Sequence, residues 1–476
     1  MKPVDVAIIG AGTAGLNAWS EVEKRGGRAL LIESGAYGTT CARVGCMPSK
    51  LLVAAAEGAE QIRRAEIFGV RAARGLEVDG AAVMARVRRE RDRFAGGMVA
   101  ATEEIPADQR RRGRARFLDP TTLDVEGERV KARAVVIAAG SSPWVPPPFD
   151  DLAQWVVTSD AVFDLKDLPK SLAVIGTGII ALELGQSFSR LGVEVSFFNP
   201  SDDFGSFSDP EVDRAARNVF CRELDFHLRA EVQAAVADEA GVRLTWRDAD
   251  GSRHERPFAM VLAAAGRRPN LDGLDLAATG LALDEQGRFP FDPTTAQCDD
   301  LPIFMAGDVT GRSGQLHQAS DEGRIAGANA MLYPNIERHR RRTDLAIAFT
   351  DPQMAIVGAR FADLDKESVT IGAANYANQG RARVMAENEG LVRLYAERGS
   401  GRLVGAEMFG PRVEHMAHLL AWSCQQGLSV PTILEMPFYH PVLEEGLRTA
   451  LRELARKLDL ASQRCEDEAD NPGCWL

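Results

Sequence analysis

The sequence has few features of a secreted or membrane protein. None of its apolar runs approaches the roughly 20 residues that a membrane-spanning helix needs. Its seven cysteines are odd in number and scattered over 476 residues, unlike the disulfide framework of a secreted domain. We therefore expect no membrane association and a location in the reducing cytoplasm.

Basic residues are outnumbered as well. The 56 lysines and arginines stand against 68 aspartates and glutamates, which gives a formal net charge of −12. This acidic balance argues against general binding to nucleic acid or to anionic membranes. The length and the otherwise ordinary composition predict a globular protein of roughly two to four domains.

A dinucleotide-binding pattern begins near the N-terminus. The β-branched run Val4–Ile9 predicts a buried parallel strand. Three glycines follow at the spacing that provides a tight turn, a close approach to a pyrophosphate and close helix packing, namely Gly10, Gly12 and Gly15. Glu33 ends the next predicted strand and is placed to bind ribose hydroxyls. Because this glycine spacing suits a nucleotide turn and no polar cleavage region follows, we expect mature sequence here rather than a signal peptide.

The same pattern recurs later in the chain. A second predicted strand, Leu172–Ile175, leads into Gly176 and Gly178, with Ala181 at the third position. The helix after them is followed by another strand, Val193–Phe198. An internal repeat of this kind indicates two nucleotide-binding domains, which is far more specific than a single glycine triplet.

Two cysteines lie between these nucleotide motifs. Cys41 and Cys46 enclose four residues, and a predicted helix, Pro48–Arg64, follows. The positive end of that helix favours a thiolate at Cys46. A disulfide closing so short a loop would stabilise the fold by only about 2 kcal/mol, so the pair suits redox cycling better. On spacing alone, two unrelated loop cysteines remain an alternative.

The segment Thr40–Lys50 closely resembles the redox-active disulfide of the flavin disulfide reductases, and the resemblance extends over nearly the whole chain. It implies an α/β fold with two Rossmann-like nucleotide-binding domains and a C-terminal α+β dimerisation domain. The implied divisions are an FAD domain (1–150 and 272–345), an NAD domain (151–271), an interface domain (346–460) and an acidic tail (461–476).

The resemblance assigns roles to the redox residues. Cys41 corresponds to the interchange thiol that meets substrate, and Cys46 to the charge-transfer thiol against the flavin. Lys50 and Glu183 correspond to a pair beside the flavin ring. The first glycine motif corresponds to the FAD site. Further FAD and NAD contacts are expected at Ala115, Gly140, Gly266, Gly307, Asp308 and Leu316.

A catalytic base is expected near the C-terminus. His440-Pro441 is followed by Glu445, five residues after the histidine, as in the family's motif. Val442 departs from the threonine that is usual there. The resemblance implies that His440 and Glu445 act in the active site of the partner subunit of a homodimer.

The nicotinamide site is expected to take NAD. Asn199 stands where NAD-using relatives carry an acid, whereas NADP-using relatives have arginines nearby for the 2′-phosphate. No arginine or lysine occurs from Gly192 to Pro210, and Asp202 and Asp203 would repel a phosphate. Alanine at the third glycine position favours NADP weakly.

Within the family, the leading hypothesis is dihydrolipoamide oxidation with FAD and NAD, on a dihydrolipoyl group that is free or on a carrier protein. It rests on the Pro-Ser-Lys form of the disulfide segment, the Ile-Ile run after Gly178 and the missing arginines. The alternatives are a mercuric-type or glutathione-type reductase, or a redox sensor of low turnover. Cys465 and Cys474 lie in the tail, which is interpreted as an acidic disordered segment or as an auxiliary thiol shuttle.

Overall fold

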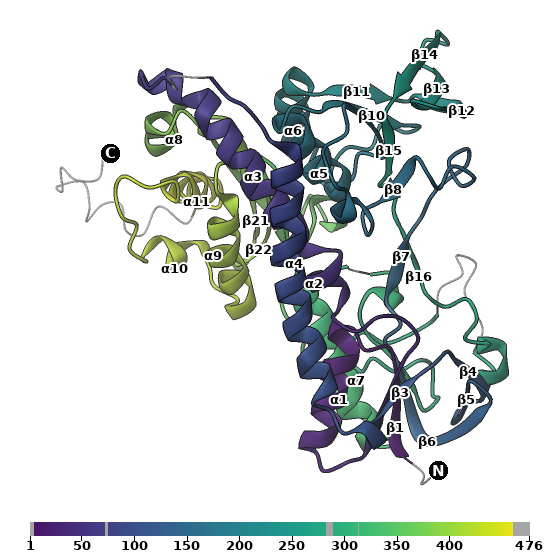
Figure 1. Cartoon of the computed structure of the whole chain (residues 1–476). Coiled ribbons are helices and arrows are strands. Elements are labelled where there is room, and N and C mark those ends of the chain that lie inside the picture. Colours follow the sequence, from purple (N-terminus) through teal and green to yellow (C-terminus); the bar gives the residue numbers. More distant parts are fainter. Residues whose placement is uncertain (1–3, 72–74, 282–288, 313, 460–476) are drawn as a thin grey trace.

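The computed structural model describes residues 4–71, 75–281, 289–312 and 314–459 (Figure 1). Cys465, Cys474 and the rest of the predicted tail lie outside these residues. Within the described ranges, no helix combines the length and the apolar character needed to cross a bilayer.

The first sheet carries the N-terminal glycine motif. Its strand order is β3 (Arg110–Arg112), β2 (Ala29–Glu33), β1 (Val4–Ile9), β6 (Glu128–Ile137), β5 (Thr122–Val125) and β4 (Ala115–Asp119). β17 (Ile303–Met305) adds to β6 in parallel. β1 is parallel to both β2 and β6, and it is almost wholly buried, which explains its unbroken apolar sequence.

Two helices pack closely beside this sheet. They are α1 (Thr13–Lys24) and α7 (Leu316–Leu332), which run side by side in Figure 1. A Cβ atom on Gly323 would lie 2.2 Å from the Ala14 carbonyl oxygen, and one on Gly327 would lie 2.5 Å from that of Ala18. Only glycine therefore permits this helix contact.

The second sheet is wholly parallel. Its order is β11 (Asp225–Leu228), β10 (Glu194–Asn199), β9 (Ser171–Ile175), β15 (Met260–Ala263) and β8 (Val156–Thr158). The helices of this region are α5 (Ile179–Arg190) and α6 (Pro210–Glu223). An antiparallel sheet of β12 (Glu231–Asp238), β13 (Gly241–Arg247) and β14 (Arg253–Phe258) lies beside it, and β7 (Ser141–Pro143) pairs with β16 (Arg267–Pro269) where the chain passes between the two nucleotide folds (Figure 1).

The C-terminal sheet is antiparallel. Its order is β18 (Leu345–Ala348), β19 (Gln353–Gly358), β22 (Leu403–Gly410), β21 (Leu391–Glu397) and β20 (Val369–Asn375). The helices of this region are α8 (Gly380–Val384), α9 (Val413–Gln426), α10 (Val430–Leu434) and α11 (Glu445–Lys457). Gly372 of β20 lets α11 approach, since a Cβ there would lie 2.2 Å from the Ala450 carbonyl oxygen.

The cysteine segment lies in two helices, and a third helix packs against both of them (Figure 1). They are α2 (Thr40–Arg43), α3 (Cys46–Arg64) and α4 (Gly80–Glu103). The prediction that the helix begins at Pro48 is wrong by two residues, because α3 already begins at Cys46 with Gly45 as its N-cap. Proline is tolerated at the third position because the first N–H groups of a helix have no intrahelical partner.

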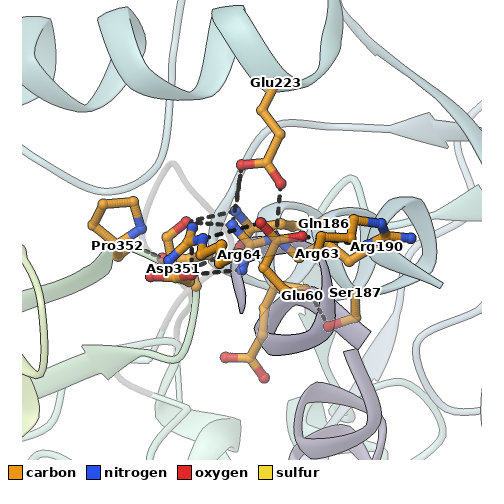
Figure 2. A network of polar contacts seen from close by, with 11 residues as sticks. Glu60, Arg63, Arg64, Gln186, Ser187, Arg190, Glu223, Asp351 and Pro352 are labelled. Atoms are coloured by element: carbon orange, nitrogen blue, oxygen red, sulfur yellow. Dashed lines mark hydrogen bonds and ion pairs between the residues drawn. The ribbon is translucent and has the colours of Figure 1, made fainter. Parts of the chain in front are cut away.

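A buried arginine joins three parts of the chain (Figure 2). Arg190 of α5, only 5% exposed, donates from Nε to Glu223 over 2.7 Å and from Nη1 to Asp351 over 2.7 Å. Asp351 also pairs with Arg64 of α3 at 3.0 Å. One polar cluster therefore joins α5 and α6, the loop between β18 and β19, and α3.

Candidate active site

The first glycine turn has the geometry that a pyrophosphate needs. Gly10 has a φ of +107°, and a Cβ there would lie 2.2 Å from the Ala138 carbonyl oxygen. A Cβ on Gly15 would lie 1.9 Å from the Gly10 carbonyl oxygen, whereas one on Gly12 would meet nothing within 4 Å. The turn is therefore closed toward the protein and open at Gly12, where the N-terminus of α1 favours an anion.

Glu33 braces this turn. Its Oε2 accepts from the Ala11 N–H at 2.7 Å, and its Oε1 accepts from the Gly35 N–H at 2.6 Å. Each carboxylate oxygen can accept a second hydrogen bond, so Glu33 can hold the turn and still accept from a ribose hydroxyl.

The other predicted FAD residues follow the ends of neighbouring strands. Gly140 comes after β6 and Gly307 after β17, and Ser141 Oγ donates to Asp308 Oδ2 at 3.1 Å. Since β6 and β17 are parallel neighbours, both turns lie at the carboxyl edge of the first sheet. Ala115 is buried at the start of β4, and Leu316 begins α7 with an exposed side chain. Gly266 lies elsewhere, after β15 of the second sheet, where its carbonyl oxygen accepts from the Trp144 N–H.

The two sulfurs belong to consecutive helices and are not bonded to each other in this structure. Cys41 is in α2, and Cys46 is the first residue of α3. A hydrogen bond from the Cys41 thiol and the nearby Lys50 charge, against the opposing effects of burial and Glu183, lower the pKa of Cys46 to about 7. That shared proton, together with burial, raises the pKa of Cys41. Of the two thiols, Cys46 is therefore the one that ionises first, and close to neutral pH.

The structure brings Lys50 and Glu183 together across 133 residues of sequence. Lys50 Nζ donates to Glu183 Oε1 at 2.5 Å. Glu183 Oε2 accepts from the Phe349 N–H at 3.0 Å, and the ring of Phe349 lies 4.5 Å from Lys50 Nζ. Sequence reasoning missed Phe349, because no local pattern marks a residue that contributes its backbone and ring from another sheet.

His440 and Glu445 also meet, at the start of α11. His440 Nδ1 lies 3.0 Å from Glu445 Oε1, and Glu445 Oε2 accepts from the Val442 N–H at 3.1 Å. The imidazole is 67% exposed, so its Nε2 faces outward while Glu445 orients the ring. In the described part of the chain, neither residue has a hydrogen bond or ion pair to Cys41 or Cys46.

The second glycine turn opens into a cavity of about 760 Å³, a size suited to a nucleotide. Gly176 has a φ of +109° and fits against the Ala264 carbonyl oxygen, while Gly178 is open. Asn199 lines this cavity, but its Nδ2 already donates to Thr177 Oγ1 at 2.6 Å and to the Asp203 carbonyl at 2.9 Å. Asn199 therefore shapes the loop after β10.

Two arginines lie beside this loop although none occurs from Gly192 to Pro210. They are Arg217 of α6 and Arg229 after β11, and both contact Asp202. A search limited to the adjoining sequence missed them, because both elements fold back onto the loop.

The geometry therefore defines a thiol-based oxidoreductase with two nucleotide sites. Residues 4–323 match the family described as pyridine nucleotide-disulphide oxidoreductase, and residues 345–451 match that family's dimerisation domain. The chain belongs to the pyridine nucleotide-disulphide oxidoreductase family. Proteins of this family use FAD and NAD or NADP, and the open faces at Gly12 and Gly178 fit the pyrophosphates of two such groups.

Related proteins carry different names. The chain is 30% identical to a dihydrolipoyl dehydrogenase of Chlamydia muridarum, covering 93% of this chain and 94% of that one. It is 32% identical to a mercuric reductase of Shigella flexneri, covering 94% and 80%. Among solved structures, LpdA from Mycobacterium tuberculosis aligns with a TM-score of 0.82 at 23% identity, covering 95% and 100%, which shows the shared fold.

Proposed function

We propose that this protein is a homodimeric, NAD-dependent dihydrolipoamide dehydrogenase, which oxidises a dihydrolipoyl group to the lipoyl disulfide through Cys41 and Cys46. The dihydrolipoyl group is free or attached to a carrier protein. We also propose the domain division given by the sequence, and a reducing cytoplasm as the setting, in keeping with scattered cysteines.

The observation that carries this proposal is the pairing of His440 with Glu445. Oxidising a dithiol requires the removal of a proton from each thiol, and an exposed imidazole held by a carboxylate suits that task. Reduction of a mercuric ion has no substrate proton to remove. The pair therefore favours a dithiol substrate over the metal-ion substrate named for the mercuric relatives.

The sulfur chemistry follows from the pKa order of the two cysteines. His440 takes a proton from one substrate thiol, and the resulting thiolate attacks the Cys41 sulfur of the Cys41–Cys46 disulfide. Cys46 leaves as a thiolate, which the nearby Lys50 charge favours. The second substrate thiol attacks the substrate sulfur of the mixed disulfide, and its proton passes to the leaving Cys41 sulfur, whose pKa is raised. The two substrate protons therefore end on His440 and Cys41. The substrate loses two electrons, and the cysteine pair gains them.

FAD, when bound, supplies the route from this dithiol to the nicotinamide. Lys50 is held by Glu183 next to Cys46, so its charge stabilises the thiolate while electrons leave. Within one chain, over the residues that the structure describes, His440 has no hydrogen bond or ion pair to Cys41 or Cys46, which supports a base donated by a second subunit, as does the match to a dimerisation domain.

The test is a comparison of substrates. With NAD, dihydrolipoamide should be oxidised much faster than mercuric ion or glutathione disulfide is reduced with NADH or NADPH. His440→Gln should slow dihydrolipoamide oxidation by about 10²–10⁴-fold. His415→Gln is a matched control, because His415 is also 67% exposed and lies beside a glutamate, Glu414. Faster turnover with mercuric ion, or equal rates for His440→Gln and wild type, would contradict the proposal.

A further inference from the structure

The loop after β10 is surrounded by charges that the cavity itself does not use. Asp202 Oδ2 accepts from Arg229 Nη2 at 2.7 Å, and its Oδ1 lies 3.4 Å from Arg217 Nη1. The Asp202 carbonyl oxygen also accepts from Arg217 Nη2 at 2.5 Å. A single residue thus binds both guanidinium groups, through its carboxylate and its backbone. Arg217 is held in addition by Asp213, whose Oδ2 accepts from Arg217 Nε at 2.6 Å, and it lies over the ring of Phe204.

These arginines lie next to the nucleotide cavity without lining it. The Arg229 N–H donates to the Ser201 carbonyl at 3.0 Å, and the next residue, Ala230, lines the cavity. Ser201 and Asp203 line it as well, and Ser201 Oγ donates to Asp203 Oδ2 at 2.7 Å. The cavity wall therefore contains the Asp203 carboxylate, whereas the guanidinium groups of Arg217 and Arg229 point toward Asp202.

This position is where nicotinamide sites distinguish their two nucleotides. In nucleotide folds of this kind, the end of the second strand, here β10, lies beside the adenosine ribose. In NADP-binding proteins, arginines at this position bind the 2′-phosphate. The side chains of Arg229 and Asp202 are 64% and 51% exposed. Because so much of both faces solvent, their ion pair is the main interaction that holds the Arg229 guanidinium group in this position. The donors for a 2′-phosphate are present but occupied.

We propose that Asp202 determines the nucleotide specificity of this site, by holding Arg229 away from the adenosine ribose and so excluding a 2′-phosphate. The inference rests on the proposed use of NAD and assigns it to one residue. Without the Asp202 carboxylate, the Arg229 guanidinium group is free to turn toward the cavity and to bind the 2′-phosphate of NADP, whereas Arg217 keeps its bonds to Asp213 and to the Asp202 carbonyl oxygen.

The experiment measures binding of two probes to the FAD-loaded enzyme by calorimetry: 5′-AMP, and adenosine 2′,5′-bisphosphate. Wild type should bind 5′-AMP more tightly. Asp202→Ser should shift the ratio of the two dissociation constants toward the bisphosphate by at least about tenfold, the effect of one charge-assisted hydrogen bond. Asp202→Asn provides a second variant of nearly unchanged shape. Glu194→Gln is the control, because Glu194 forms an exposed ion pair with Arg256 on the same sheet and does not line the cavity.

A second background distinguishes a freed arginine from reduced repulsion between Asp202 and the 2′-phosphate. In Arg229→Met, Asp202→Ser should give no gain in bisphosphate binding. An unchanged ratio in both Asp202 variants, or a gain that persists without Arg229, would overturn the proposal. Probe binding requires no dithiol, so failure of dihydrolipoamide oxidation would leave this result interpretable, and the reverse also holds.

Discussion

The two ends of one face of α5 make a useful comparison. Glu183 and Arg190 are two turns apart on the same buried face, with 6% and 5% of their side chains exposed. Glu183 binds Lys50 and the Phe349 N–H, while Arg190 binds Glu223 and Asp351. Through Phe349 and Asp351, both ends of this face join α5 to the loop that follows β18, the first strand of the C-terminal sheet.

The difference lies in what each ion pair faces. Lys50 remains 35% exposed and affects the Cys46 thiolate, so its charge is available to chemistry. Arg190 directs its guanidinium to two carboxylates and the Asp351 carbonyl oxygen, and Gln186 binds the Asp351 backbone between the two ends (Figure 2). One end therefore tunes a reactive sulfur, and the other holds separate parts of the fold together.

The largest expected effect is on stability at the Arg190 end. Arg190→Met should lower the free energy of unfolding by about 3 kcal/mol, the lower end of the range for a broken buried pair, because Glu223 and Asp351 are 31% and 29% exposed. Urea unfolding measures this, with Arg63→Met as the control. Arg63 forms a more exposed pair with Glu60, so its loss should change stability by less than about 1 kcal/mol. Equal losses of unfolding free energy in the two variants would contradict the expectation that the buried Arg190 contributes more to stability than the exposed Arg63.

The next effect is on reactivity at the Lys50 end. Lys50→Met should raise the pKa of Cys46, because the Lys50 charge lowers it and Glu183 raises it. Each unit of increase above neutrality leaves about tenfold less thiolate at pH 7. Alkylation of the reduced enzyme by iodoacetamide as a function of pH reports the shift. A profile identical to that of wild type would show that Lys50 does not act on the sulfur.

Cys41 offers a further test of the same end. Cys41→Ala removes the thiol that donates to Cys46 and should raise the Cys46 pKa, whereas Cys41→Ser retains a donor and should raise it less. The same alkylation profile distinguishes the two variants, and the serine variant is the control for loss of the disulfide. If alanine and serine shift the profile equally, the hydrogen bond is not the main cause.

The smallest effect is expected at Glu183. Glu183→Gln should lower the Cys46 pKa slightly, the opposite direction to Lys50→Met, because a negative charge is removed. The amide oxygen can still accept from the Phe349 N–H, so stability should fall less than in Arg190→Met. Comparing the alkylation midpoints of Glu183→Gln and Lys50→Met tests this opposition of signs.

Sequence patterns predicted those parts of the molecule that depend on local spacing. The glycine turns at Gly10 and Gly176, and the strands before them, follow from short periodic patterns that act over a few residues. The resemblance to a known family pointed to the Lys50–Glu183 and His440–Glu445 pairs, which the structure brings together.

The remaining contacts depend on tertiary packing. Arg190 meets Asp351 across 161 residues, and Glu183 meets the Phe349 backbone across 166. Arg217 and Arg229 reach Asp202 from two different elements. Nothing in the neighbouring sequence of any of these residues specifies its partner, so their roles could not be predicted before the fold was known.

The late arrival of β17 has a consequence for synthesis of the chain. Until Ile303–Met305 leaves the ribosome, the β6 residues Val135–Ile137 lack the partner strand on one side, and α1 lacks the glycine surface of α7. At about 5–20 residues per second, the roughly 170 residues between β6 and β17 take about 8–34 s to be translated. The second nucleotide fold lies within that interval. The first sheet of the nascent chain therefore has an unpaired strand edge during this time, which is a feature that favours aggregation.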